Sequence, residues 1–323
     1  MNVPHKSLLP LICLLLTSTS WAADTASSTG PAGPLSQAER YARRCQKQAP
    51  ERYQWPQGPY LWGSKLSWDD SQPQHDSRHS VLVSVDTPSL SKDAVGSVLS
   101  GSASDGSPVE VSICEAEPDP SDPQMVWYRI EAWNPVAQAW DNPCIPSGSG
   151  PNPRALAVSG VWDSTGAHQQ VKGKLTLACE NGVISKCITW GYKPWASRNG
   201  QPLAPLHQAC TRMARADYCG NGISHTQPGT PIDMYDSLGV QTPTTQPSQA
   251  WNPARASFEA AWVPDGATCL SRTRLGKALE TILQECPGRF RASASVDLGQ
   301  GDVCTLQRSD VNPSSALLKN RSY

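Results

Sequence analysis

The cysteines constrain this chain more than any other feature of its sequence. One of the 11, Cys13, lies in an apolar run near the N-terminus that is typical of a signal peptide, so ten are left once that segment is removed. An even number of cysteines in an exported chain predicts a framework of disulfides without a free thiol. The ten are Cys45, Cys114, Cys144, Cys179, Cys187, Cys210, Cys219, Cys269, Cys286 and Cys304.

Residues 1–22 have the pattern of a signal peptide. Lys6 precedes the apolar run of residues 8–16, and small residues stand before a cleavage position at Ala23. The run is shorter than the roughly 20 apolar residues of a membrane-spanning helix, and no later segment approaches that length. We therefore expect a secreted or periplasmic protein without an integral membrane segment after cleavage.

Composition narrows the range of partners and cofactors. The 27 basic and 28 acidic residues nearly cancel, which disfavours nucleic acid and anionic membrane surfaces as partners. Structural zinc is the alternative to disulfides, but no two cysteines have the C-x-x-C spacing and the chain has only 6 histidines. We therefore expect no metal and no cofactor.

The mature chain is expected to begin with a disordered leader and a short helix. Residues 23–35 are small, polar and without apolar periodicity, which predicts disorder. Ser36 and Glu39 have the spacing of a capping box. They predict a helix that runs to Pro50 and turns Cys45 towards the core.

A β-rich module follows the leader and spans residues 36–144. A disulfide between Cys114 and Cys144 would tie its strands together. Residues 145–154 are rich in proline, glycine and serine and form the clearest linker, which would separate this module from a C-terminal domain of residues 155–323. Alternating apolar residues predict antiparallel strands at residues 81–83, 109–113 and 125–133.

A β-hairpin is predicted near the start of the C-terminal domain. Residues 171–177 alternate as a strand does, and Asn181 and Gly182 form a dipeptide suited to a two-residue turn. In such a hairpin Cys179 and Cys187 point to opposite faces, so a direct bridge between them would be strained.

A short amphipathic helix is predicted from Pro205 to the glycine turn after Cys219. Nine residues of helix rise about 13 Å, so Cys210 and Cys219 are too far apart to pair with each other. We expect each to bridge elsewhere, at least one of them to Cys179 or Cys187. The apolar face holds Leu206, Cys210, Met213, Ala214 and Asp217, and the opposite face holds Gln208, Arg212 and Arg215.

A second amphipathic helix is predicted at residues 275–286. Leucine, alanine and isoleucine recur there at intervals of three and four, and a Pro-Gly dipeptide follows. Cys269 and Cys286 flank this helix and should not pair, for the same reason of length. Between the two helices, the polar, proline-rich residues 241–253 predict an exposed loop.

Three stretches of the C-terminal part resemble a known family. They are KCITWGYKPW at residues 186–195, CTRMARADYCGNG at 210–222 and GTPIDMYD at 229–236, and agreement continues at FEAAW in 258–262, at Cys269 and at 320–322. In this order they resemble the bacterial ADYC domain family, named for the tetrapeptide at residues 216–219. The resemblance covers most of residues 155–323. It implies a secreted bacterial protein with a cysteine-rich α+β domain, and it brings no catalytic residues with it.

Within the tetrapeptide, Asp217 and Tyr218 are candidate binding residues. Asp217 falls on the apolar face of its helix, where a lone carboxylate would be costly to bury. It is either a functional acid, base or ligand-binding group, or a structural carboxylate that accepts backbone N–H groups from the following turn. The structural interpretation is favoured, because short polar side chains near helix ends commonly bond in this way.

Two further carboxylates suggest a calcium site. Asp233 and Asp236 could join Asp217 as oxygen ligands for Ca²⁺. The spacing lacks the alternating Asp/Asn run and the glycine of an EF-hand loop, so an ordinary surface turn is the favoured interpretation.

The alternative function is that of a small secreted hydrolase. His207 and His225 flank the tetrapeptide, and one of them could act as a base oriented by Asp217 or Asp233. The nucleophile is missing, because no G-x-S-x-G occurs, Cys219 is expected in a disulfide and Ser224 is supported only by proximity.

A tryptophan-rich segment offers a different kind of site. Exposed indoles there could stack on sugars or peptides, although packing over a disulfide-linked core is the favoured interpretation. The aromatic residues are Tyr53, Trp55, Tyr60, Trp62 and Trp68.

The sequence therefore predicts an exported α+β protein with an antiparallel β-rich N-terminal module and a disulfide-rich C-terminal ADYC domain that has two short amphipathic helices. We expect a binding or structural module with an unknown carbohydrate or protein ligand outside the cytoplasm. The candidate binding residues are His207, Asp217, Tyr218, Asp233 and Asp236.

Overall fold

The computed structural model describes residues 34–46, 65–67, 83–103, 106–144, 154–180, 182–227 and 230–323. The chain falls into two compact units, Met1–Leu35 and Ser36–Tyr323, and every helix and strand named below belongs to the second. None of the helices in the described ranges has the length and apolarity that a membrane crossing needs. The predicted signal peptide, nearly all of the predicted leader and the aromatic residues Tyr53, Trp55, Tyr60, Trp62 and Trp68 lie outside the described residues.

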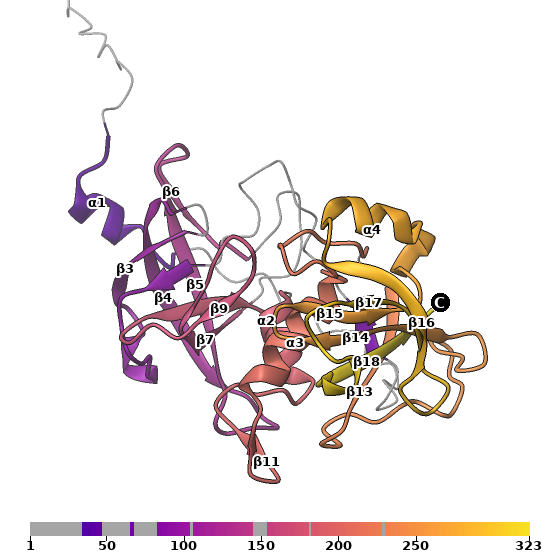
Figure 1. The fold of residues 1–323 in the computed structure, drawn as a ribbon. Helices are drawn as coiled ribbons and strands as arrows, with labels where there is room; N and C mark the ends of the chain where they lie inside the picture. The colour runs from indigo at the N-terminus through magenta and orange to yellow at the C-terminus, as the bar shows by residue number, and fades with distance from the viewer. Residues whose placement is uncertain are drawn as a thin grey trace, which may run out of the picture. The chain divides into compact units, whose positions relative to one another are not determined.

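Six antiparallel strands close a barrel (Figure 1). Their order is β4-β3-β2-β10-β7-β5, and β5 pairs back with β4, while β6 (Ala139–Asp141) extends the sheet beside β5. The strands predicted at residues 109–113 and 125–133 are confirmed within β4 and β5. The strand predicted at residues 81–83 overlaps β2 only at Val83, and residues 81 and 82 lie outside the described residues. The barrel strands are β2 (Val83–Val85), β3 (Val98–Ser102), β4 (Pro108–Pro118), β5 (Val126–Asn134), β7 (Ala155–Ser159) and β10 (Leu175–Cys179). The core that they enclose contains Val85, Val111, Ile113, Tyr128, Ile130, Leu175 and Leu177.

Seven further antiparallel strands form a second sheet, whose order is β1-β13-β18-β14-β15-β17-β16. Two short hairpins complete the β structure, β8 (Val161–Trp162) with β9 (His168–Gln169) and β11 (Ser197–Arg198) with β12 (Gln201–Pro202). The strands of the second sheet are β1 (Lys65–Ser67), β13 (Thr230–Asp236), β14 (Ser257–Val263), β15 (Gly266–Leu270), β16 (Phe290–Asp297), β17 (Val303–Arg308) and β18 (Leu318–Ser322).

Two adjacent helices join the barrel to the second sheet. Helix α2 (Val183–Thr189) packs against β10 of the barrel and against α3 (Ala204–Arg215). Helix α3 in turn packs on β14, β15 and β18, and Figure 1 shows both helices between the two β layers. Because α3 has neighbours on both sides, Gln208 and Arg212 are buried, and the predicted solvent-facing side of this helix is wrong.

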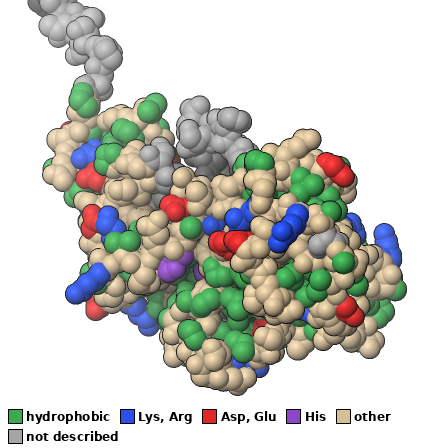
Figure 2. Space-filling view, viewed as in Figure 1, with side chains coloured by type: hydrophobic (Ala, Val, Ile, Leu, Met, Phe, Trp, Pro, Cys, Tyr) green, Lys and Arg blue, Asp and Glu red, His purple; other side chains and the backbone are tan. Residues whose placement is uncertain are grey.

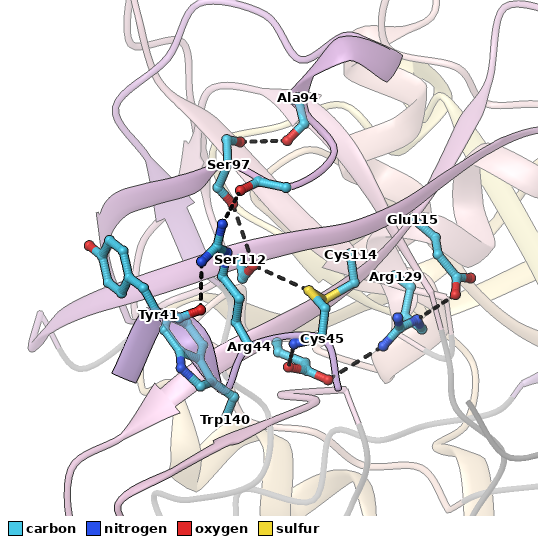
Figure 3. Close-up of a disulfide and its surroundings, with 12 residues drawn as sticks. Tyr41, Arg44, Cys45, Ala94, Ser97, Ser112, Cys114, Glu115, Arg129 and Trp140 are labelled. Carbon is cyan, nitrogen blue, oxygen red and sulfur yellow. Dashed lines mark hydrogen bonds and ion pairs between the residues drawn. A yellow bond between two sulfur atoms is a disulfide. The ribbon is translucent and has the colours of Figure 1, made fainter. Parts of the chain in front are cut away.

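The N-terminal helix α1 (Gln37–Ala42) has the predicted capping box between Ser36 and Glu39. It ends well before Pro50, because Cys45 has a left-handed backbone with a φ of 56° and bonds to Cys114 in β4. Around this disulfide, the Cys45 N–H donates to Glu131 Oε2 at 2.7 Å (Figure 3).

The predicted hairpin turn at Asn181 and Gly182 is wrong. Residue 181 is not described, but Gly182 is the N-cap of α2, and Cys187 lies in that helix and not on a strand. Ile184, Cys187 and Ile188 are all buried, which is the i, i+3, i+4 spacing of a helix face. The segment is rich in β-branched residues, which favour strands, so its helical period was not recognised in the sequence.

The two predicted C-terminal helices are present with different bounds. Helix α3 begins at Ala204, with Pro205 in its first turn, and ends at Arg215. Helix α4 (Leu279–Glu285) starts later than predicted, because Leu275 has a φ of 65° in the preceding 3₁₀ turn. The loop at residues 241–253 contains no helix or strand, as predicted.

All ten cysteines of the described chain form disulfides, which confirms the predicted framework. Cys210 and Cys219 have different partners, as predicted, and Cys210 bonds to Cys187 in α2. The predicted Cys114–Cys144 bridge is wrong, since each bonds to a more distant part of the chain. The pairs are Cys45–Cys114, Cys144–Cys179, Cys187–Cys210, Cys219–Cys286 and Cys269–Cys304, with Cα separations from 5.3 to 5.9 Å.

The described part of the second unit is mostly β with four α-helices, in line with a β-rich, disulfide-linked α+β protein. The predicted division at residues 145–154 is not confirmed. Strands β7 and β10, which follow that segment, complete the barrel, and the Cys144–Cys179 disulfide joins residues on both sides of it.

Candidate functional site

The tetrapeptide Ala216–Cys219 reverses the chain at the end of α3. Ala216 is fully buried and has a left-handed backbone with a φ of 51°. Its N–H donates to the Met213 carbonyl, and the Asp217 N–H donates to the Arg212 carbonyl, each at 2.9 Å. These two bonds satisfy carbonyls at the helix end and compensate the unfavourable conformation of a non-glycine residue.

Asp217 is fully buried, and donors within the fold hold its carboxylate. Oδ2 accepts hydrogen bonds from Arg212 Nη1 at 2.6 Å and from the Gly222 N–H at 3.0 Å. Oδ1 accepts one from the Asn221 N–H at 3.1 Å. Arg212 is only 2% exposed and donates to two backbone carbonyls as well. This geometry favours the structural interpretation of Asp217, with an ion pair added that the sequence did not indicate.

Tyr218 is fully buried and connects the turn to two distant segments. Its hydroxyl donates to Glu259 Oε1 at 3.1 Å and accepts the Arg274 N–H at 2.7 Å. Its ring stacks on Trp262 with centroids 5.4 Å apart. Burial raises the pKa of Tyr218 well above its ordinary value, and the Glu259 charge adds to the effect. The hydroxyl therefore stays protonated and serves as a structural donor.

Glu259 and Arg274 form a fully buried ion pair that the sequence analysis missed. Arg274 Nε and Nη2 bind the two carboxylate oxygens at 3.1 and 3.0 Å. The guanidinium also donates to the carbonyls of Met213 and Ala214 at the end of α3, at 2.8 and 3.0 Å. Only the position of Glu259 in an otherwise apolar strand could have indicated such a partner.

Cys219 and Gly220 complete the contacts of the tetrapeptide region. Cys219 bonds to Cys286 at the end of α4. Gly220 has a φ of 67°, and a side chain there would overlap the Asp265 carbonyl in the turn between β14 and β15. The residues from Ala216 to Gly220 thus form a junction, which we call the ADYC junction, where α3, β14, the β14–β15 turn, the 3₁₀ turn at Arg274 and α4 meet.

His207 lies on α3 and is 1% exposed. Its Nε2 lies 3.0 Å from the Ile184 carbonyl, and its ring packs edge-on against Trp162. Burial lowers the pKa of His207 to about 4. A neutral imidazole with one nitrogen on a backbone carbonyl and no carboxylate in contact lacks the orienting partner of a catalytic base.

His225 and Ser224 follow the ADYC junction but do not act on each other. Nε2 of His225 lies 2.8 Å from Glu285 Oε2, and Nδ1 lies 3.4 Å from Lys277 Nζ. Burial and then the Lys277 charge lower the pKa of His225 to about 4. The Ser224 hydroxyl donates to the Arg215 carbonyl at 2.9 Å, so this serine is held by backbone and not by an imidazole.

Asp233 and Asp236 on β13 each organise a nearby loop. Asp233 is fully buried and accepts hydrogen bonds from the N–H and the hydroxyl of Thr244 at 2.9 and 2.7 Å. Asp236 accepts the Tyr192 hydroxyl at 2.9 Å and three backbone N–H groups from residues 238–241. Burial and the Asp236 charge raise the pKa of Tyr192 above its ordinary value.

The predicted site residues do not contact one another. His207, Asp217, Asp233 and Asp236 each have separate partners, so the calcium and hydrolase hypotheses receive no support from the contacts of the described residues. One group of three potential metal-ligating atoms occurs among those residues, and two of its members are oxidised to a disulfide, which leaves no thiolate to bind an ion. The group consists of Cys45, Cys114 and Glu131.

An open groove lies between the β4–β5 loop and the α2–α3 loop. Its volume is about 470 Å³, within the range of small-molecule sites. On the face shown in Figure 2, acidic and basic side chains are interspersed, and hydrophobic side chains gather over α2, α3 and β11. The groove is lined by Gln124, Ala157, Trp195 and Ala196.

Trp195 is the aromatic residue of this groove and is 46% exposed. It ends the segment from Tyr192 to Trp195, whose other members are used by the fold, since Tyr192 bonds to Asp236 and Lys193 forms an ion pair with Asp122. The Trp195 side chain makes no hydrogen bond or ring contact with any residue that the structure describes. In the sequence this tryptophan stands in the stretch KCITWGYKPW, where no local pattern identifies it as a site residue.

The model of the ADYC domain family matches residues 91–276, which is more than half of the chain. The match begins in the 3₁₀ turn before β3 and ends in the one that contains Arg274. It therefore includes the ADYC junction, most of the barrel and the Trp195 groove. No curated protein and no solved structure matches the chain.

Proposed function

The chain belongs to the ADYC domain family, and we propose that it is an exported, non-catalytic binding module whose ligand site is the groove at Trp195. The observation that carries this proposal is a contrast between two parts of the molecule. The polar side chains of the ADYC junction are bonded within the fold, whereas Trp195 is exposed beside an open groove.

The disulfides and the N-terminal sequence support the proposal that the protein is exported. Five disulfides form and persist in oxidising compartments, and residues 1–22 have the pattern of a signal peptide. The proposed location is the bacterial periplasm or the cell exterior.

The hydrolase alternative lacks an assembled catalytic group. A serine hydrolase needs a hydroxyl in hydrogen-bond contact with an imidazole that a carboxylate orients. Ser224 bonds to a backbone carbonyl, and His207 contacts a carbonyl and an indole. His225 contacts Glu285 and Lys277, so the contacts of the described residues give no support for activation of Ser224 by either histidine.

The test combines a ligand screen with an activity screen on the purified, oxidised protein. Thermal-shift measurements with saccharides, amino acids, nucleotides, fatty acids and short peptides should give at least one class that raises the melting temperature of the wild type and not that of Trp195→Ala. Chromogenic ester, amide and glycoside substrates should show no turnover. Turnover that disappears in His207→Gln or Asp217→Asn would replace the binding proposal with the hydrolase.

A further inference from the structure

Building on the proposed binding role, we propose that the Trp195 groove binds a neutral saccharide, with the apolar face of one sugar ring stacked on the indole. A pyranose ring has C–H groups on its faces and hydroxyl groups around its edge. Its binding site therefore needs a flat apolar surface beside uncharged donors and acceptors. The groove supplies both.

The flat surface is the indole of Trp195. Nearly half of its area is open to solvent, and among the described tryptophans it alone is exposed. Trp133 and Trp190 are half-buried, and the others, Trp127, Trp140, Trp162, Trp251 and Trp262, are buried. A tryptophan combines a large apolar face with an N–H donor, and it loses little conformational freedom on binding. Leaving this surface exposed costs free energy that a stacked ligand would recover.

The uncharged polar groups lie at the edge of the same groove. Gln124 is exposed, and its side-chain amide makes no hydrogen bond with the residues described, so its carbonyl and NH₂ are available to hydroxyl groups. Its backbone N–H donates to Asp122 Oδ1 at 3.1 Å, which fixes the position of the loop. The Trp195 N–H is a further donor.

The charges near the groove are already paired. Lys193, two residues before Trp195, forms an ion pair and a hydrogen bond with Asp122, two residues before Gln124. The bond to Lys193 lowers the pKa of Asp122, so this carboxylate stays charged at neutral pH and remains paired. A charged ligand would find no unpaired partner among these residues, which favours a neutral one.

The groove is also held open by its surroundings. Its two alanines, Ala157 on β7 and Ala196, leave space beside the indole that larger side chains would fill. Pro194 restricts the backbone before Trp195, and the Ala196 carbonyl accepts the Leu203 N–H at 2.9 Å across the base of the β11–β12 hairpin. A preorganised platform of this kind loses little entropy when a ligand binds.

Other ligand classes fit less well. A fatty acid requires a largely apolar enclosure, whereas this groove is open and has an amide at its edge. An extended peptide binds by adding a strand to a free sheet edge. Strand β7, which lines the groove, pairs with β10 along its length and with β5 at Ala155 and Leu156, so at most three of its residues are left for such a strand.

Isothermal titration of the oxidised full-length protein with cellotetraose, chitotetraose and maltotetraose tests the proposal. At least one should bind, and Trp195→Ala should weaken it by about tenfold or more, because a central tryptophan is typically a dominant contact. Trp195→Phe should retain part of the affinity, and Gln124→Ala should lower it by a smaller factor. Val136→Ala, at a residue that is 94% exposed in the β5–β6 turn, is the matched surface control and should bind like the wild type.

The outcomes separate the ligand class from the binding role. Saccharide binding that Trp195→Ala leaves unchanged would overturn the assignment of the groove. No binding of any of the three tetrasaccharides, together with Trp195-dependent selection from a displayed peptide library, would overturn the saccharide and leave the binding module standing. No saccharide binding and no Trp195-dependent ligand of any class would overturn both proposals.

Discussion

Replacement of Asp217 by asparagine should destabilise the protein strongly. Asparagine has the shape of aspartate, but it removes the charge that pairs with Arg212 and turns one carboxylate oxygen into an NH₂ group. Both oxygens of Asp217 accept hydrogen bonds, Oδ1 from Asn221 and Oδ2 from Gly222 and Arg212. Whichever way the new amide is turned, its NH₂ group therefore faces a donor.

The magnitude follows from the burial of the pair. Removing one partner of a buried ion pair typically costs about 3–5 kcal/mol, because the remaining charge is left uncompensated. Arg212 keeps its bonds to the carbonyls of Thr165 and Pro264, so we expect the lower end, about 3 kcal/mol. For a chain of this length, that loss corresponds to a fall in melting temperature of roughly 6 °C.

Thermal unfolding followed by circular dichroism, under non-reducing conditions, measures this change. The matched control is Asp310→Asn, since Asp310 pairs with Arg308 at 2.6 Å but its side chain is 63% exposed. Because the Asp310 carboxylate lies largely in solvent and the buried Arg308 keeps its ion pair with Asp265 at 2.7 Å, the control should melt close to the wild type. A melting temperature of Asp217→Asn equal to or above that of the wild type would refute the reasoning and return Asp217 to the candidate functional residues.

Three further predictions test the framework around this residue. Thiol titration of the denatured mature protein should find no free cysteine, and two or more thiols per chain would contradict the five disulfides. Glu259→Gln should lower the free energy of unfolding by about 3–5 kcal/mol, because Arg274 would stay buried without its counter-ion. Urea unfolding of this variant that matches the wild type would show that the ion pair is not needed for stability. The pKa of His207 is about 4 in the fold against an ordinary 6.5, so the unfolded chain takes up the proton first as the pH falls. The contribution of His207 to the free energy of unfolding is therefore fully present above about pH 6.5, and it declines by up to about 3 kcal/mol as the pH falls to 4. Urea unfolding across that range should show a weaker pH dependence in His207→Gln, and an identical pH dependence would assign the effect to other groups.

The regular parts of the fold were predictable because their local patterns agree with their tertiary environment. Strands β4 and β5 form where apolar and polar residues alternate in the sequence, the capping box at Ser36 forms, and the length of α3 keeps Cys210 and Cys219 apart. Where other elements cover a helix on both sides, the pattern of polar and apolar residues did not predict which side chains are buried. Helix α3 was expected to expose Arg212, yet a second helix and a sheet cover it.

The disulfide partners and the junction depended on contacts between distant segments. The spacing of the cysteines does not favour the observed Cys45–Cys114 disulfide over the predicted Cys114–Cys144 disulfide. The observed disulfide depends on where the segment after α1 lies against the barrel. The Glu259–Arg274 pair is equally non-local. Trp195 was missed for the opposite reason, since only the structure distinguishes one exposed tryptophan from those that are buried.

The ADYC junction shows how a family motif can hold a fold together. Asp217, Tyr218 and Cys219 each bind a different segment, through an ion pair, a buried hydroxyl and a disulfide. A substitution there therefore changes the stability of the whole second unit before it changes any surface. A motif with this role specifies a fold, and the fold can present different surfaces to different ligands. The proposed ligand site at Trp195 differs from this junction, because its side chain makes no hydrogen bond or ring contact with the described residues and can be changed without breaking such a bond.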